Sequence, residues 1–354
     1  SEIQKTYFFI KDCKKLGTLP FAGIARCAFI ATKILRSLVA NKILNENDLE
    51  NFYESIFTVT KKMNFSYQNI NNINKKKKFL KTYGHLRPST YSITSKNYYE
   101  NFNKYFSKKS KRILKTTKKF NITKEQIKKI NQTFFYHNLQ FDCNIFFKFA
   151  RDSINFREYA KLIFTKSIDE IFKNLIKFSK RIKISREDLQ YISIKNFLNY
   201  YSHVDIEKLK TILKNEIKQN KKNSKTLNLI EFPEFISNVN NLYFQEQRSK
   251  IGNYVTTKVT HGETIHIKKI KDYSILSNKI VLLENADPGY DFIFSHNIKG
   301  LMTEYGGSNS HMSIRCLELG IPAIIGMGSK EFKLVLSSNS IEINCKQKYY
   351  KILN

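Results

Sequence analysis

The placement of glycine divides this 354-residue chain into two parts that obey different local rules. Seven of the twelve glycines lie within residues 289–328, and the other five are spread over the first 262 residues. Glycine destabilises helices and permits tight turns, so its scarcity favours long helices and its abundance favours a turn-rich fold. The chain is therefore expected to be α + α/β, with a large, mainly helical domain over residues 1–250 and a compact β/α domain over residues 251–354.

The first part shows the spacing of amphipathic helices. Apolar residues recur at intervals of three and four, and few helix breakers interrupt them. Residues 184–201 predict a helix that begins at Ser185, where an acidic residue at the third position could complete a cap. Residues 205–219 predict an amphipathic helix that ends in the polar loop 220–226.

The second part shows short β-branched segments bounded by turns, which are typical of strands. A helix over residues 310–319 is expected to end at Gly320 and Pro322. The order strand, loop, helix, strand indicates a compact α/β domain of about 100 residues. The predicted strands are residues 254–260, 263–270, 279–285, 300–305 and 322–328, with a closing hairpin of residues 340–345 and 349–353.

Cysteine usage and hydropathy favour a cytoplasmic protein. The five cysteines are scattered and form no CxxC pair, which argues against a disulfide framework or a zinc site. No signal peptide opens the sequence. The apolar stretch Leu19–Ala40 is interrupted by Arg26, Lys33 and Arg36, so no membrane span or membrane partner is expected. Because the chain begins at Ser1 without an initiator methionine, we interpret it as part of a longer or processed protein.

The positive charge lies almost entirely in the first part. The net charge is +31, and residues 260–354 contain only 11 basic and 9 acidic residues, which leaves an excess of +29 for residues 1–259. We favour the interpretation that this excess charge lies on solvated helix faces and reflects a codon bias toward lysine and asparagine. A basic nucleic-acid-binding or scaffold protein is the alternative from another functional class, and its test is duplex DNA binding with a steep salt dependence.

The segment around His311 predicts a phosphoryl-binding site. Gly306 and Gly307 follow a predicted strand and precede a predicted helix, where backbone N–H groups can approach a ligand closely. The N-terminus of a helix offers unpaired N–H donors and partial positive charge. His311 lies in the first turn, and a neutral imidazole can form a covalent intermediate. The alternative is a capping loop that contains an incidental histidine.

A longer pattern surrounds His311. It is made of Thr303, Gly306, Gly307, Ser310, His311, Ile314, Glu318, Leu319, Gly320, Ile321, Pro322 and Gly326. This pattern resembles the swivelling phosphohistidine domain of phosphoenolpyruvate-utilising enzymes. The resemblance implies that His311 accepts a phosphoryl group in one place and delivers it in another. It also implies that Thr303 and Ser310 orient the ring or the phosphoryl oxygens, and that Gly306 and Gly307 supply the close backbone.

One departure from that family pattern concerns an arginine. Many members carry arginine six residues after the histidine, where this chain has Leu317, and here Arg315 follows four residues after His311. Arg315 is therefore expected either to face the phosphoryl group or to be solvated.

The chain ends 43 residues after His311, which resembles enzymes whose histidine domain is C-terminal, as in the rifampicin phosphotransferase type. That resemblance implies an N-terminal ATP-grasp domain, absent from this sequence, that binds ATP and Mg²⁺. It also implies an acceptor-binding domain in the helical region. The chain contains no GxxxxGK[ST] loop, so we expect no cofactor, no metal and no autophosphorylation from ATP in this part alone.

The segment Gly84–Pro88 is the best indication of where an acceptor binds. It resembles a motif of the acceptor domain in that family, and an extended backbone would place His85 and Arg87 on one side, able to hold a carboxylate or phosphoryl group. The alternative is a surface turn with a packed histidine. Arg157 and Lys161 share one helix face and are expected to meet the phosphohistidine or, with slight preference, to be solvated beside acids such as Glu158.

The acceptor itself is suggested only by resemblance. Residues 16–39 and 156–172 resemble a branch associated with capsular polysaccharide loci, of the L-glutamine kinase type, which implies transfer to the amide nitrogen of L-glutamine. A rifampicin-type antibiotic or pyruvate is the alternative acceptor.

Overall fold

The structure is a computed structural model that describes residues 1–106, 120–199, 205–227, 236, 238–239, 252–270, 272–308 and 310–353. It divides into two compact units. The first draws on residues 1–14, 91–95 and 166–249, and the second on residues 15–90, 96–165 and 250–354. The predicted boundary between residues 250 and 251 lies outside the described residues, and the division into an acceptor domain and a phosphohistidine domain stays a prediction.

The first unit is helical. Glu2 at the start of α1 forms ion pairs with Lys177 and Arg181 near the end of α8. A buried aliphatic and aromatic cluster that includes Phe178 and Leu209 holds these helices together. The elements are α1 (Glu2–Asp12), the end of α8 (Cys143–Arg181), the 3₁₀ helix η2 (Asp188–Tyr191), α9 (Ile194–Leu198) and α10 (Ile206–Leu227).

Two helix predictions in this unit were wrong in extent. The Ser185 hydroxyl does accept from the Asp188 backbone N–H, but the helix lasts one 3₁₀ turn, and Ser193 caps the separate helix α9. Helix α10 continues to Leu227 through the stretch that was expected to be a loop. Lysine is a good helix former and the stretch contains no glycine or proline, so local composition permits the helix to continue.

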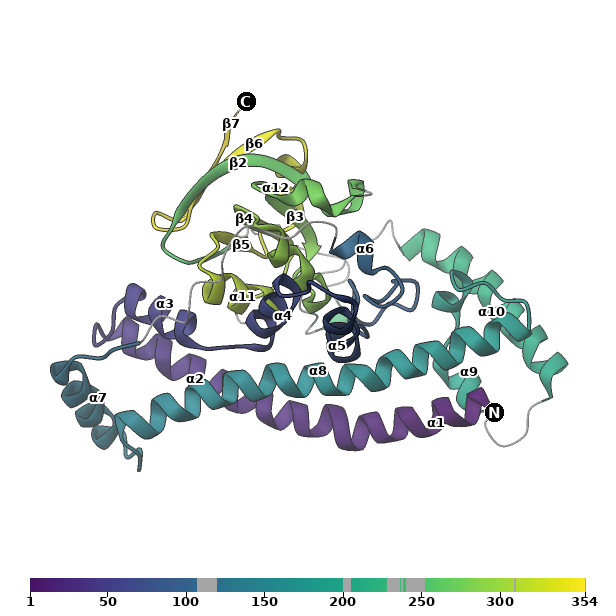
Figure 1. Ribbon diagram of the computed structural model, residues 1–354, viewed down its shortest axis with the longest axis horizontal. Helices are drawn as coiled ribbons and strands as arrows, with labels where there is room; N and C mark the ends of the chain where they lie inside the picture. Colours follow the sequence, from purple (N-terminus) through teal and green to yellow (C-terminus); the bar gives the residue numbers. More distant parts are fainter. Residues whose placement is uncertain are drawn as a thin grey trace. The chain divides into compact units, whose positions relative to one another are not determined.

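The helices of the second unit carry threonine, glutamate and arginine side chains that lie close to the glycine-rich residues 289–328. Ala28 and Leu35 on α2 are buried. The elements are most of the π-helical turn η1 (Cys13–Thr18), α2 (Leu19–Ala40), α3 (Glu46–Ser55), α4 (Val59–Gln68), α5 (Ile73–Tyr83), α6 (Phe102–Tyr105), α7 (Lys124–Tyr136) and the first part of α8 (Figure 1).

A seven-stranded mixed sheet forms the rest of this unit, in the order β1-β5-β4-β3-β2-β6-β7. The neighbours from β2 to β5 are parallel, and the outer pairs are antiparallel. The elements are β1 (Asn253–Val255), β2 (Val259–His266), η4 (Ile267–Lys269), η5 (Tyr273–Leu276), β3 (Ile280–Asn285), η6 (Pro288–His296), β4 (Gly300–Tyr305), α11 (His311–Leu319), β5 (Ala323–Ile325), α12 (Ser329–Leu336), β6 (Ser340–Asn344) and β7 (Tyr349–Leu353).

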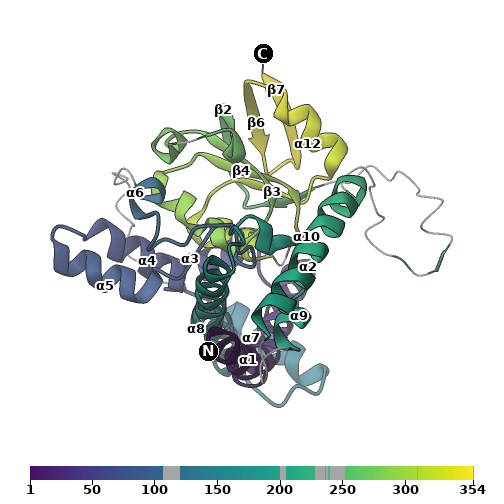
Figure 2. The same ribbon diagram turned by 90° about the vertical axis from the view of Figure 1, so that its right-hand side faces the viewer.

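The predicted strands are found, but several differ in extent. The strand predicted over 263–270 ends at His266, where the 3₁₀ helix η4 follows, and β5 is shorter than the strand predicted over 322–328. The segment predicted as one strand over 254–260 bends at Thr256, whose φ of 79° separates β1 from β2. Helix α12 was not predicted, and Figure 2 shows it beside the sheet. Its Phe332 and Val335 pack with alternate strand residues such as Ile280 and Leu282.

Helix α11 is covered on two sides, which explains why most of it is buried. Met312 and Cys316 belong to the same hydrophobic cluster as sheet residues such as Leu301. Ile314 packs into a different cluster, formed with helices α2, α3, α7 and α8. A polar side chain on α11 is therefore enclosed between the sheet and helices from the first half of the sequence.

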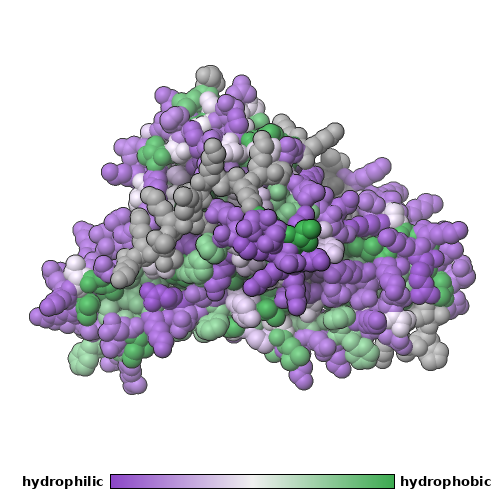
Figure 3. Space-filling view, viewed as in Figure 1, coloured by the Kyte–Doolittle hydropathy of each residue, from purple (hydrophilic) through white to green (hydrophobic). Residues whose placement is uncertain are grey.

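One continuous helical segment, Glu2–Ala40, is long and apolar enough by length and composition to span a membrane, among the residues the structure describes. Length and composition alone are weak evidence, since core helices and signal sequences share them. The face in Figure 3 is mostly hydrophilic, with hydrophobic side chains in separate patches. Cytoplasmic localisation stays a prediction.

Candidate functional site

The loop between β4 and α11 requires glycine where its backbone meets a neighbouring strand. Gly306 has a φ of +143°, and a Cβ there would lie 2.7 Å from Ala286 Cβ. Gly326, at the end of β5, has a φ of +71°, and its Cβ would lie 2.0 Å from the Gly306 carbonyl oxygen. These two glycines therefore fix the path of the loop as it enters α11. Asn309 lies outside the described residues.

The other loop positions predicted to bind a phosphoryl group have different surroundings. Nothing lies within 4 Å of an ideal Cβ on Gly307, so this position faces open space. The Ser310 hydroxyl caps α11 by accepting from the Ser313 N–H at 3.2 Å. Thr303 is buried, and its Oγ1 accepts from the Gly326 N–H at 3.0 Å. This contact ties β4 to β5, and the roles proposed for Thr303 and Ser310 toward a phosphoryl group stay predictions.

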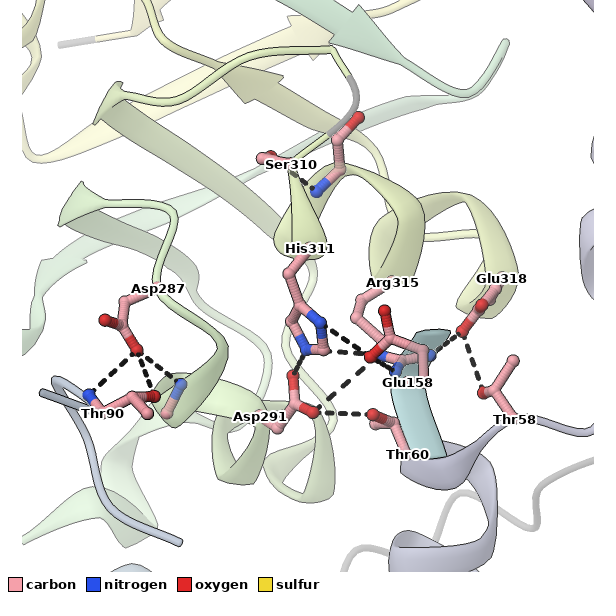
Figure 4. Close-up of polar contacts among 12 residues, drawn as sticks. Thr58, Thr60, Thr90, Glu158, Asp287, Asp291, Ser310, His311, Arg315 and Glu318 are labelled. Carbon is pink, nitrogen blue, oxygen red and sulfur yellow. Dashed lines mark hydrogen bonds and ion pairs between the residues drawn. The ribbon is translucent and has the colours of Figure 1, made fainter. Parts of the chain in front are cut away.

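Sheet topology explains why His311 meets an aspartate. Strands β3 and β4 are parallel, with Asn285 paired to Tyr305 at their carboxyl ends. The segments that follow them, η6 and the loop to α11, therefore leave the same edge of the sheet. Asp291 lies in η6 and His311 at the first position of α11, and Asp291 Oδ1 lies 2.7 Å from His311 Nε2 (Figure 4).

A second carboxylate reaches the other ring nitrogen from helix α8. Glu158 Oε2 lies 2.9 Å from His311 Nδ1, and the contact is an ion pair whose angle is not that of a hydrogen bond. The His311 side chain is 7% exposed. Both ring nitrogens are therefore occupied by carboxylates in a site almost closed to solvent (Figure 4).

Arg315 completes the cluster, and it is buried. Its Nη2 lies 2.5 Å from Glu158 Oε2 and its Nη1 2.5 Å from Glu318 Oε2, with the arginine side chain 0% exposed. The interpretation of Arg315 as a solvated residue is wrong, because α11 is enclosed on both sides. Arg315 Nε also lies 3.4 Å from His311 Nε2, but that nitrogen cannot accept from it while it donates to Asp291.

Two threonines at the start of α4 hold the outer carboxylates. Thr60 Oγ1 donates to Asp291 Oδ2 at 2.7 Å, and Thr58 Oγ1 donates to Glu318 Oε2 at 2.9 Å. These neutral donors stabilise buried charge without adding charge of their own. Asp291 is thus held from one side by Thr60 and binds His311 from the other.

The electrostatics of the cluster favour a protonated histidine. Burial lowers the pKa of His311, but Asp291 and Glu158 outweigh burial and leave that pKa above its ordinary value. Burial also disfavours the charged form of Glu158 and so raises its pKa. The positive charges of Arg315 and His311 outweigh this effect and bring the pKa of Glu158 well below the usual range. Burial raises the pKa of Glu318 despite the nearby Arg315.

Arg157 and Lys161, the two cations predicted on α8, lie beside this cluster. Burial lowers the pKa of Lys161, while the charges of Glu158, Asp287 and Asp291 oppose the shift, which places the ammonium near these carboxylates. The Arg157 guanidinium lies 5.2 Å from the Phe29 ring centroid. Glu158, expected to solvate these two cations, instead pairs with His311 and Arg315.

His85 lies in a turn, so the extended backbone predicted for the segment does not hold at His85, while the prediction for Arg87 is not tested. The Leu86 N–H donates to the Tyr83 carbonyl, so the last turn of α5 continues past Gly84. His85 Nε2 lies 2.9 Å from the Leu162 carbonyl oxygen and 3.2 Å from Thr165 Oγ1 on α8, contacts typical of a packed histidine.

Arg87 is buried, and its backbone packs against the segment that carries Asp291. A Cβ on Gly289 would lie 1.8 Å from the Arg87 carbonyl oxygen. Asp287 accepts from both the backbone N–H and the hydroxyl of Thr90. The predicted acceptor segment and η6 are therefore packed together, and acceptor binding by His85 and Arg87 stays a prediction.

Sequence reasoning missed Asp291 and Thr60 as site residues. Neither belongs to the motif around His311, and no periodicity singles them out. One feature of the sequence could have indicated Glu158 as a site residue: it directly follows Arg157, which was predicted to share a helix face with Lys161. Among the described residues, no group of three or more His, Cys, Asp or Glu side chains is placed to hold a metal ion.

Comparisons with known proteins concern the part of the chain that contains His311. Residues 275–348 match the family described as PEP-utilising enzyme, mobile domain. A stretch of 103 residues is 29% identical to the rifampicin phosphotransferase of Bacillus cereus, and one of 102 residues is 28% identical to that of Bacillus subtilis (strain 168). Each alignment covers 29% of this chain and 12% of the relative. These similarities support a phosphotransferase at the family level.

Asp291 and His311 lie inside the matched family region, whereas Glu158 lies outside it. The site therefore joins the region that resembles a mobile domain to a helix from the first half of the chain.

Proposed function

We propose that this chain is the acceptor-binding and phosphoryl-carrying part of an ATP-dependent phosphotransferase. His311 takes a phosphoryl group derived from ATP, with AMP and phosphate as the other products, and passes it to a small acceptor. The observation that carries the proposal is the position of His311 at the first residue of α11, inside the region that matches the mobile domain of PEP-utilising enzymes.

The chemistry of the site supports a carrier histidine. The Gly306–Gly307 turn and the N-terminus of α11 supply backbone N–H groups and partial positive charge beside the ring. Arg315 provides a fixed cation next to His311, and Gly307 leaves space for a group to enter. Positioning and charge stabilisation are the main contributions a protein makes to phosphoryl transfer.

The proposed acceptor is L-glutamine, phosphorylated at its amide nitrogen for capsule phosphoramidate synthesis. The acceptor would approach from α8, where Lys161 and Arg157 add positive charge beside Glu158. A rifampicin-type antibiotic is the second candidate, because the two relatives described above are rifampicin phosphotransferases. Pyruvate remains the third candidate to be tested.

ATP and Mg²⁺ are proposed to bind an ATP-grasp domain of the same protein. The sequence of this chain has no GxxxxGK[ST] loop, and the described residues offer no cluster of metal-ligating side chains. No step is therefore assigned to ATP or Mg²⁺ within this chain. We place the protein in the cytoplasm, without a nucleic-acid or membrane partner.

The direct test substitutes the carrier. In the full-length enzyme, His311→Asn should abolish acid-labile label from ATP labelled in the transferred phosphoryl group, while the exposed His261→Asn should retain it. Undiminished labelling of His311→Asn would contradict the proposal. Thermal-shift screening of this chain against L-glutamine, rifampicin and pyruvate identifies the acceptor, because a ligand that binds only the folded state raises the unfolding temperature.

A further inference from the structure

Glu158 occupies a position that a carrier histidine alone does not require. It comes from α8, outside the region that matches the mobile-domain family, and its carboxylate lies 2.9 Å from a nitrogen of His311. Its Oε2 atom receives both the ring contact and Arg315, while Oε1 has no polar contact among the described residues. One oxygen of this buried carboxylate therefore remains able to accept a further hydrogen.

The two carboxylates on His311 are held differently. Asp291 lies in η6, inside the same family-matched region as His311, so it can stay beside the ring when that region moves, whereas its contact with Thr60 on α4 is made outside that region. Glu158 lies on the helix that also carries Lys161, on the side from which the acceptor is proposed to approach. A phosphoryl group on the nitrogen that faces Glu158 would occupy the space between the imidazole and α8.

We propose that Glu158 is a catalytic residue that takes the proton of the acceptor and returns it to His311. The inference rests on the proposed function and concerns its transfer step. The acceptor is a molecule with an N–H or O–H group, as in an amide or an alcohol.

The step balances without an additional reactant. The acceptor nitrogen or oxygen forms a bond to phosphorus as the phosphorus–nitrogen bond to His311 breaks, and the electron pair of that bond returns to the ring. The acceptor proton passes to Glu158 and then to the freed ring nitrogen. The products are the phosphorylated acceptor, an imidazolium and a carboxylate, the same ion pair that His311 and Glu158 form in the structure.

The charges around Glu158 suit this sequence of events. In the structure, burial raises the pKa of Glu158. The positive charges of Arg315 and His311 on α11 and of Arg157 on α8 lower this pKa by more than burial raises it, so the carboxylate holds no proton. Lys161 also faces it, and Asp291 faces His311 from η6. Phosphorylation replaces the positive imidazolium by an anionic group, which raises the pKa of Glu158 and makes it a better base. Loss of the phosphoryl group reverses the change and releases the proton to His311.

The test separates the two half-reactions in the full-length enzyme. Loading is measured as acid-labile label on His311 from ATP, and discharge as its loss on adding whichever of L-glutamine or rifampicin discharges the wild type. Discharge by pyruvate alone, a ketone without an N–H or O–H group, would overturn the role of Glu158. Glu158→Gln keeps the side-chain shape but cannot accept a proton. Above the pH midpoint of wild-type loading, it should load as fully as the wild type and discharge roughly 10²–10⁴-fold more slowly, the usual contribution of a general base. The wild-type decline of discharge at low pH should also disappear.

Glu170→Gln is the matched control, because Glu170 is an exposed carboxylate on the same helix, and it should discharge at the wild-type rate. If Glu158→Gln fails to fold, Glu158→Asp retains the carboxylate with a shorter reach, and it should load normally but discharge at least about tenfold more slowly, below the full general-base contribution. Discharge of the folded variant at the wild-type rate would overturn the role of Glu158. Failure of the wild type to load His311 would instead overturn the proposed function.

Discussion

The carboxylate of Glu158 lies 2.9 Å from Nδ1 of His311 and joins two parts of the chain that sequence comparison treats separately. The contact favours the imidazolium form of the histidine, because a second carboxylate, Asp291, binds the other nitrogen and both raise the pKa of His311. An imidazolium cannot attack phosphorus, so the same contact that favours the discharged state must be weakened before loading.

The pH dependence of loading should reflect this pairing. The pKa of His311 is raised, so the protonated, carboxylate-paired form persists above the ordinary histidine pKa of about 6.5 and is lost as pH rises through the folded value. Loading from ATP should therefore increase with pH, with a midpoint above about 6.5. Measurement of the initial loading rate across pH 5–9 checks this.

Asp291→Asn and Glu158→Gln should each move that midpoint to lower pH, because each removes a negative charge that stabilises the imidazolium. Glu170→Gln should leave it unchanged. A midpoint in the wild type at or below that of the two variants would contradict the charge assignment.

Replacement of Arg315 should be among the most destabilising changes in the chain. Arg315→Met leaves Glu158 and Glu318 buried without their cation, and breaking a buried pair in this way costs about 3–5 kcal/mol. Lys129→Met removes an exposed ion pair with Glu125 and should change the free energy of unfolding by no more than about 1 kcal/mol. Urea unfolding of both variants measures the difference, and equal stabilities would show that the Arg315 pairs do not form.

Thr60 should matter for stability through Asp291 alone. Thr60→Val keeps the branched shape but removes the hydroxyl that donates to the buried carboxylate, at an expected cost of about 1–3 kcal/mol. The same change at the half-buried Thr82, whose hydroxyl bonds only to its own helix, should cost less than about 0.5 kcal/mol. Denaturant midpoints for the two variants decide the matter, and a neutral Thr60→Val would remove Asp291 from the set of supported residues.

Substitution by alanine should destabilise the protein at Gly306 but not at the adjacent Gly307. Gly306→Ala places a Cβ 2.7 Å from Ala286 Cβ at a φ of +143° and should destabilise by about 1–3 kcal/mol. Gly307→Ala enters open space and should leave the thermal midpoint nearly unchanged. Thermal unfolding monitored by circular dichroism compares them, and similar losses in both variants would mean that the loop follows a different path.

Local features of the fold could be predicted from sequence because they depend on neighbouring residues. The strands at 280–285 and 300–305 and the helix from His311 to Leu319 follow from β-branched runs, a capping serine and a terminal glycine. The end of α10 was predicted wrongly, because polar composition at 220–226 permits a helix as readily as a loop. The extended backbone predicted at His85 was also wrong, because the chain makes a further turn through Gly84 before it leaves α5.

The sequence by itself determined where a phosphoryl group could be carried. The glycine-rich turn, the helix N-terminus and His311 are contiguous, so their proximity is guaranteed by the covalent chain. Only the tertiary structure decided what surrounds the histidine. Parallel pairing of β3 with β4 brings Asp291 to His311, and the burial of α11 between sheet and helices brings Glu158 and Thr60 into the same cluster. These residues are distant in sequence, and packing rather than any local pattern places their charges together.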